Sequence, residues 1–366
     1  MQAVLRRMSA SFVDGLDATL IVATLLLAAV GLATLYSASH DAPARLTGQL
    51  MNFAVAFAAM WIAARISPEL LMRAAFPAYA VGLALLVAVA LYGDTVNGAR
   101  RWLHVGVTRF QPSEMMKLAL PLMLAWYFAR NEETLRLRDF AVGALLVAIP
   151  VLLIARQPDL GTAALVAAAG VYILYFAGLG WRVMATLAVL GGASLFPLWG
   201  LLHDYQRKRV LTLLDPSQDP LGAGYHTIQS TAVGSGGVFG KGWLQGTQAH
   251  LEFIPERHTD FIFAVYSEEF GLLGNCLLLA LYTLLIGRGL MITAQATSFF
   301  SRLVAGAVTL MFFTYAFVNM GMVAGILPVV GVPLPFISYG GTALVTLFIG
   351  IGILMSLRRQ RRLVPT

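Results

Sequence analysis

The sequence predicts an all-α fold: a polytopic membrane protein with about ten transmembrane helices and one long extracytoplasmic loop. The chain of 366 residues is 58% hydrophobic and only 12% charged, whereas soluble domains carry about 25% charged residues. Its mean hydropathy is +0.77, and about ten spans of about 20 residues would account for this apolar excess. We therefore expect a single transmembrane domain over residues 1–366.

The first predicted helix follows a basic N-terminus. "MQAVLRR" precedes an apolar run at 19–38 that is long for a signal-peptide core, and more apolar runs follow, so this helix is expected to be retained. Pro112 favours the start of a later span, because proline suits the first turn of a helix. The predicted spans are 19–38, 48–64, 74–92, 112–129, 140–155, 160–178, 182–201, 262–287, 303–325 and 338–357.

Basic residues indicate the orientation of these spans. Ten spans place both termini on one side, and the arginines of the short connections gather there, which predicts that this side is cytoplasmic. The basic residues form no stripe with interleaved aromatics, so no nucleic-acid partner is expected. The lone Cys276 lies within an apolar run and is interpreted as a small core residue.

The one long connection, 202–261, is predicted to be extracytoplasmic. Connections of this length are usually functional or disordered, and its apolar and aromatic content favours short helices at the outer membrane surface. Arg207, Lys208 and Arg209 form a basic patch. This patch could bind a diphosphate through charge-assisted hydrogen bonds, or only contact anionic lipid.

Polar residues at three predicted helix starts each have two interpretations. Glu114 and Lys117 share a helix face and should pair, since an unpaired charge in the membrane is costly; the pair could hold the bundle or form the floor of an outward cavity. Asp159 could line that cavity or cap its helix. Asp260 could likewise cap a helix, or act as a general base beside Arg257 and His258.

Further polar and flexible residues are expected near the same cavity. At least one of Glu268 and Glu269 should face a polar interior. The glycines and prolines of 325–344 indicate irregular backbone, which persists at membrane depth only when it is buried in protein or lines a wet cavity. Ser338 and Tyr339 would then meet this cavity.

Two function classes fit this arrangement. One is a transporter of an anionic or amphipathic substrate. The other is an enzyme that acts on a lipid-linked diphosphate at the outer leaflet. The polar residues gather toward one face, which favours the enzyme, because a transporter needs access from both sides.

Ordered motifs add a family resemblance. "GARRWL", "RFQPSE", "QPDLGT", "DYQRKRV", "DPLGAGYHTIQS", "FIPERHTDFIFAV" and "GILPVVGVPLPFISYGG" span most of the chain, which resembles the SEDS family (shape, elongation, division and sporulation). "PERHTD" and the short tails look like its elongation branch rather than its division branch. The resemblance implies a peptidoglycan glycosyltransferase that polymerises lipid II at the periplasmic face of the inner (cytoplasmic) membrane, with a class B penicillin-binding protein, a transpeptidase, as partner. Lipid II flipping is the competing function.

The resemblance also implies roles for individual residues. Asp260 matches the family's proposed catalytic aspartate and would deprotonate the acceptor hydroxyl, and Glu114 and Lys117 match a pair important for activity. Asp159, Glu256, Arg257, His258 and Ser338 would support the cavity. Arg101, Arg109, Arg207, Lys208, Arg209, Gln229 and Lys241 would bind substrate. Mg²⁺ or Mn²⁺ at the diphosphate is compatible with this scheme, although no dedicated metal-ligand spacing is present.

Overall fold

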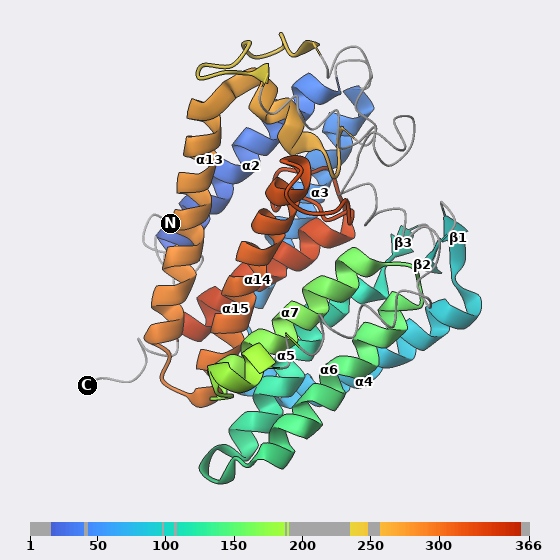
Figure 1. Cartoon of the computed structure of the whole chain (residues 1–366), viewed down its shortest axis with the longest axis vertical. Helices are drawn as coiled ribbons and strands as arrows, with labels where there is room; N and C mark the ends of the chain where they lie inside the picture. The colour runs from blue at the N-terminus through green and yellow to red at the C-terminus, as the bar shows by residue number, and fades with distance from the viewer. Residues whose placement is uncertain are drawn as a thin grey trace, which may run out of the picture.

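Figure 1 shows the chain as a computed structural model, which describes residues 16–39, 43–96, 99–105, 108–186, 189, 235–247 and 257–359. Long helices make up most of it, and a small antiparallel sheet of order β1-β2-β3 lies at one end. The helices are α2 (Ala18–Ala38), α3 (Pro43–Ala63), α4 (Pro68–Tyr92), α5 (Pro112–Arg130), the short η1 (Glu132–Thr134), α6 (Leu137–Ala155), α7 (Leu160–Phe176), α13 (Ile262–Ala294), α14 (Phe299–Val323) and α15 (Thr342–Arg359). The strands are β1 (Asp94–Val96), β2 (Ala99–Val105) and β3 (Thr108–Phe110).

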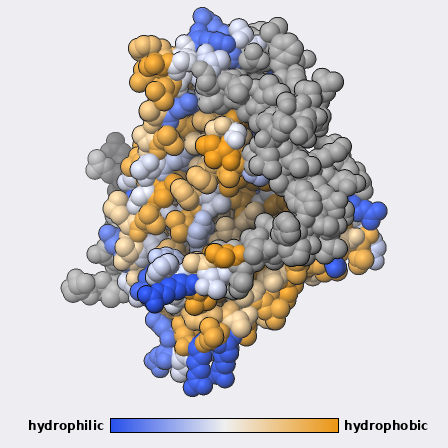
Figure 2. Space-filling view, viewed as in Figure 1, coloured by the Kyte–Doolittle hydropathy of each residue, from blue (hydrophilic) through white to orange (hydrophobic). Residues whose placement is uncertain are grey.

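The predicted spans coincide with these helices, apart from 182–201, which lies mostly outside the described residues. Within the described residues, seven helices are long and apolar enough to cross a membrane. Figure 2 shows a mainly hydrophobic surface between hydrophilic ends. The mostly helical membrane fold is thus confirmed. The sheet was not predicted, because its strands carry charged and aromatic residues without the alternation of a half-buried strand.

One end of the bundle is closed by a buried carboxylate and two arginines. Asp17 caps α2 by accepting a hydrogen bond from Leu20 N at 3.1 Å. Its other oxygen accepts from Arg288 of α13 at 2.8 Å and from Arg358 of α15. These contacts tie the start of the first described helix to the end of the last one.

Helix α13 is broken near the opposite end of the bundle, which we label the outer end after the orientation predicted from the sequence. At Gly271 φ is 61° and ψ is −157°, a conformation open almost only to glycine. The part from 272 to 294 would be about 34 Å long and could cross the membrane alone. The outer part, 262–270, therefore turns across the outer end of the bundle (Figure 1).

Small residues let the helices approach closely, as in other membrane bundles. At Gly352 of α15, an added Cβ would lie 2.4 Å from the carbonyl oxygen of Met60 and 2.7 Å from Ala63 Cβ, both in α3. At Gly31 of α2, an added Cβ would lie 2.6 Å from the carbonyl oxygen of Phe336. Helix backbones thus touch at the places where glycine stands.

The contact between α3 and α15 predicts the effect of Gly352→Ala. Alanine gains about 1 kcal/mol in helix propensity over glycine, but overpacking against backbone costs about 1–3 kcal/mol. We expect a lower melting temperature for the purified protein in detergent. Gly287→Ala is the matched control, because no atom lies within 4 Å of the added Cβ, and its melting temperature should equal or exceed that of the wild type. An unchanged value for Gly352→Ala would contradict the close approach.

Candidate functional site

The turn that precedes α13 is held against the irregular segment between α14 and α15. Ser338 Oγ donates to the carbonyl oxygen of Thr259 at 2.6 Å and accepts from Leu334 N at 2.7 Å. Tyr339 N donates to the carbonyl oxygen of His258 at 2.8 Å. Ser338 is buried and holds this turn through its two hydrogen bonds. This is compatible with the predicted role of Ser338 in supporting the cavity.

Asp260 lies in this turn and is partly buried. Its carbonyl oxygen accepts from Asn319 Nδ2 at 2.8 Å, and the same nitrogen donates to Val332 O at 2.7 Å. A Cβ at Gly331, where φ is +74°, would lie 3.1 Å from Asp260 Oδ2. Phe261 occupies the N-cap position of α13, without a side-chain cap bond. The cap position of α13 thus falls on Phe261, one residue after Asp260.

His258 is surrounded by groups from α2 and α3. Its Nδ1 lies 3.1 Å from Ser39 Oγ, and its Nε2 contacts Arg45. Burial lowers the pKa of His258 to about 4, and the charges of Arg45 and Arg257 act in the same direction. The imidazole is therefore neutral at pH 7, so it neither adds to the positive charge around Asp260 nor donates from both nitrogens.

A buried ion pair lies about one helical turn deeper. Lys117 Nζ donates to Glu114 Oε1 at 2.6 Å, and the two residues are 1% and 4% exposed. Lys117 also contacts the hydroxyl of Tyr315. Tyr315 and Asn319 are four residues apart on α14, so they lie on one face. The predicted pairing of Glu114 with Lys117 is confirmed, and α14 connects it to the turn of Asp260.

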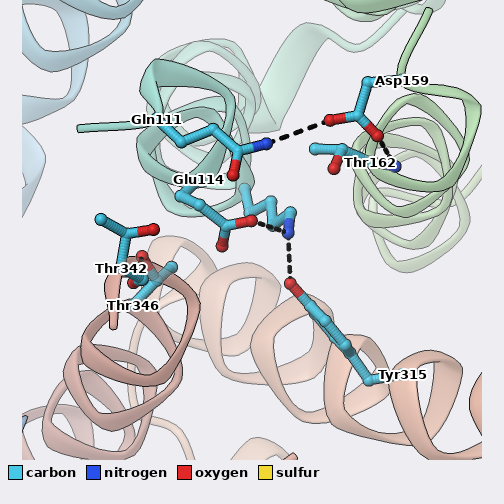
Figure 3. A network of polar contacts seen from close by, with 8 residues as sticks. Gln111, Glu114, Asp159, Thr162, Tyr315, Thr342 and Thr346 are labelled. Carbon is cyan, nitrogen blue, oxygen red and sulfur yellow. Dashed lines mark hydrogen bonds and ion pairs between the residues drawn. The ribbon is translucent and has the colours of Figure 1, made fainter. Parts of the chain in front are cut away.

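A second carboxylate lies beside this pair (Figure 3). Asp159 Oδ1 accepts from Thr162 N at 3.1 Å as the N-cap of α7, and its Oδ2 accepts from Gln111 Nε2 at 3.0 Å. The predicted capping role is thus confirmed. Arg101 of β2 donates to the carbonyl oxygen of Pro158, which places its guanidinium at the same outer turn.

An apolar groove of about 1080 Å³ runs along α3, α4, α5 and α15. Figure 3 shows Thr342 and Thr346, which line this groove, on the side of Glu114 away from Tyr315. Within the described part of the chain, Glu114 Oε2 is buried without a hydrogen-bond partner. The groove therefore passes close to the polar network. Its outer wall includes Trp102 and Phe110.

Several predicted residues lie elsewhere or outside the description. Lys241 forms an ion pair with the buried Glu268 at 2.6 Å. Arg109 lies in β3 opposite His104. Both Glu268 and Glu269 are buried, which confirms the predicted polar interior there. The positions outside the described residues are Glu256, Arg207, Lys208, Arg209 and Gln229.

Other polar residues at the site were missed from the sequence. Asn319, Tyr315 and Ser39 join the network, and the amide of Asn319 within an apolar run could have signalled it. Across the described ranges, no group of three or more His, Cys, Asp or Glu side chains could hold a metal ion.

Comparison with known proteins identifies the family. The model of the FtsW/RodA/SpoVE cell cycle proteins matches residues 17–363. The chain belongs to this family. It is 49% identical to the peptidoglycan glycosyltransferase MrdB of Escherichia coli K12 over 351 residues, which cover 95% of each chain. A probable peptidoglycan glycosyltransferase FtsW of Aliivibrio salmonicida is 36% identical and covers 94% of this chain and 90% of its own length. The elongation branch, expected from the sequence, is thus better supported than the division branch.

Solved structures of the family share the fold. A peptidoglycan synthase complex, described as coordinating polymerization and crosslinking, contains a chain with a TM-score of 0.84 and 33% identity, covering 94% of this chain and 98% of that one. The rod shape determining protein RodA of Thermus thermophilus gives a TM-score of 0.73 at 30% identity, covering 94% and 97%.

The buried ion pair predicts a coupled pair of variants. Lys117→Met leaves the Glu114 carboxylate buried without its cation, which costs about 3–5 kcal/mol. The double variant Glu114→Gln/Lys117→Met carries neither charge and should regain most of the lost stability. Melting temperatures in detergent would measure both. A double variant no more stable than Lys117→Met alone would contradict the electrostatic coupling.

His258 predicts a pH-dependent stability. The pKa of His258 is about 4 in the folded chain, against an ordinary value of 6.5, so the unfolded chain binds the extra proton more readily. The stabilising contribution is complete above pH 6.5 and is lost as the pH falls toward 4. In His258→Gln, the difference in melting temperature between pH 7 and pH 4.5 should shrink. Equal slopes in both proteins would contradict a buried neutral imidazole.

Proposed function

We infer that this chain is a peptidoglycan glycosyltransferase that polymerises lipid II into glycan strands during cell elongation. Family membership and the name of the MrdB relative support the activity. The carboxylate of Asp260, beside a glycine and above a buried ion pair, is the single observation that carries the mechanism. An enzyme at the outer leaflet needs a reactive group at one face of the membrane only, whereas a transporter needs access from both faces. Asp260 at the outer end of the bundle meets the requirement for an enzyme.

Asp260 would act as the general base. Polymerisation converts an α-linked diphosphate donor into a β-1,4 linkage, so one displacement with inversion is sufficient. Asp260 would take the proton of the acceptor 4-hydroxyl as its oxygen attacks the anomeric carbon, and the polyprenyl diphosphate would leave with the bonding electrons. General base catalysis contributes about 10²–10⁴-fold to the rate. Gly331 supports this role, since it leaves open the space next to the carboxylate.

The substrate's two chemical ends match two features of the site. The apolar groove along α3, α4, α5 and α15 suits a polyprenyl tail, because apolar walls solvate a hydrocarbon chain. Guanidinium groups stabilise the charge of a leaving diphosphate. Arg101 at the outer turn would do so, and we assign the same role to Arg109, Arg207, Lys208 and Arg209, with Gln229 as a further contact. Glu256 and Arg257 would tune the turn of Asp260.

Glu114 and Lys117 would shape the floor of the site rather than react. Both are almost fully buried and bonded to each other, so neither is presented to a substrate hydroxyl. Because the described residues offer no metal-ligand cluster, any Mg²⁺ or Mn²⁺ would enter with the diphosphate oxygens of the substrate. The steps above require only the side chains named.

We assign a transpeptidase, a class B penicillin-binding protein, as the partner. The similar peptidoglycan synthase complex combines polymerization with crosslinking. A second groove, of about 400 Å³, lies between α13 and α14 and is lined mainly by large apolar residues, with Asn275 and the small residues Ala316, Gly321 and Ala324 among them. Small residues and an amide on a membrane-facing surface are typical of helix–helix contacts in membranes. This groove would receive the partner's transmembrane helix.

The site would face the periplasm from the inner membrane. Asp17 and Arg358 meet at one end, which supports both termini on one side. Arg65 follows α3, Arg130 ends α5 and Arg302 lies in the first turn of α14, so all three are in or beside short connections predicted for that side, which is the distribution of a cytoplasmic face. The outer end, with Asp260, would then meet lipid II after its transfer across the membrane.

Asp260→Ala should abolish polymer formation by the purified protein with its partner and lipid II, a loss of about 10²-fold or more. The melting temperature and co-purification with the partner should stay at wild-type values, because Asn319 and Ser338 hold this turn through the backbone carbonyls of Asp260 and Thr259. Gel analysis of labelled glycan strands measures the product. Polymer at the wild-type rate would reject the base assignment.

Two controls separate the alternatives. Asn275→Leu, which leaves Asp260 unchanged, should weaken co-purification with the partner. If Asp260→Ala lost the partner and Asn275→Leu kept it, the groove between α13 and α14 would not be the partner's binding surface. Movement of labelled lipid II across vesicles, without any polymer, would favour the flippase.

A further inference from the structure

A glycine-rich stretch fills the break in α13. We call residues 235–247 the clasp. The break interrupts the helical hydrogen bonds, and groups at such ends need other partners. Four backbone hydrogen bonds join the clasp to both parts of the helix: Lys241 N to Glu268 O (3.0 Å), Gly242 N to Glu269 O (3.0 Å), Leu272 N to Gly237 O (2.9 Å) and Leu273 N to Val238 O (3.1 Å).

The clasp backbone lies directly on the helix backbone. A Cβ at Gly236 would lie 2.4 Å from the carbonyl oxygen of Ser267, and one at Gly240 would lie 2.1 Å from that of Glu269. Real Cβ atoms do not approach so closely. Gly236 of "GSGG" and Gly240 of "GKG" therefore serve this contact, and these two glycines need no nucleotide to explain them.

An ion pair between Lys241 of the clasp and Glu268 of α13 also holds the clasp in place. Glu268 is 0% exposed, and its Oε1 accepts from Lys241 Nζ at 2.6 Å and from Thr247 N and Oγ1 at 3.0 Å each. Removing the cation from a buried carboxylate strongly destabilises the folded arrangement around it. The charge of Glu268 therefore favours the state in which the clasp is seated.

The clasp is also tied to α2. Trp243 Nε1 donates to the carbonyl oxygen of Ala33 at 3.1 Å, and Ser37 Oγ donates to Glu269 Oε1. The clasp, α2 and the outer part of α13 thus form one connected unit. A displacement of the clasp would be transmitted to the outer part of α13.

Asp260 is at the far end of that same helical part. The outer part, 262–270, is about 13 Å long, with Glu268 near the break and Asp260 just before its first turn. The Asp260 end is held by Asn319 and Ser338. The clasp supplies the second fixed point. A displacement of about 1 Å in a catalytic group can lower a rate by about 10²-fold.

We propose that Lys241 and Glu268 are positioning residues for polymerisation: their ion pair seats the clasp in the break of α13 and thereby fixes where Asp260 meets the acceptor hydroxyl. This inference rests on the proposed function of Asp260. It replaces the expectation that Lys241 binds substrate, since its ammonium group is bonded to Glu268 and Thr247.

The test compares steady-state kinetics of full-length variants with the partner and lipid II in nanodiscs. Lys241→Met and Glu268→Gln should each lower kcat by about tenfold or more with KM unchanged. The double variant should be no slower than the slower single variant, because both substitutions release the same clasp. Lys241→Arg should recover most of the activity. Arg182→Met, an exposed residue of the opposite end, is the control.

Hydrogen exchange of backbone amides tests whether the clasp is seated, independently of enzyme activity. The amides of Lys241, Gly242, Leu272 and Leu273 should exchange faster in Lys241→Met than in wild type. Unchanged exchange, an unchanged kcat, or a raised KM at constant kcat would each overturn the positioning role. A wild-type-like Asp260→Ala enzyme would overturn the proposed function instead, so the two failures are distinguishable.

Discussion

The geometry of the outer site depends on one break in a helix. At Gly271 the chain leaves the helical conformation, and the clasp supplies the backbone partners that the break removes. Without this pairing, four polar backbone groups would be left at the edge of the hydrocarbon region, where each costs several kcal/mol. Helix α13 can therefore cross the membrane with one part and use the other to bring Asp260 over the bundle.

Helix α14 links the reactive turn to the deeper polar network. Asn319 bonds the backbone of Asp260 and Val332, and one turn below it Tyr315 contacts Lys117. The buried Lys117 thus bonds Glu114 of its own helix and Tyr315 of α14. Polar groups in an apolar surrounding have few alternative partners, so they specify one arrangement of helices that apolar packing alone would leave open.

The sequence predicts the helices well because membrane length and apolar composition are local properties. Pairing of Glu114 with Lys117 follows from their spacing, and capping by Asp159 from its place beside Pro158. For Asp260, the spacing could not fix the start of the helix, and α13 begins one residue later than a cap at Asp260 requires. Lys241 and Glu268 are 27 residues apart, and no periodicity reveals such a contact. The small sheet was missed for a similar reason, since its strands are short and defined by pairing.

The carboxylate at Asp17 imposes an order on biogenesis. It belongs to the first described helix, yet its two arginine partners stand 271 and 341 residues further along the chain. A ribosome-bound intermediate would present this acid to the lipid surface before either cation had been synthesised. The polar contacts of the first described helix are therefore complete only when the last described helix has joined the bundle.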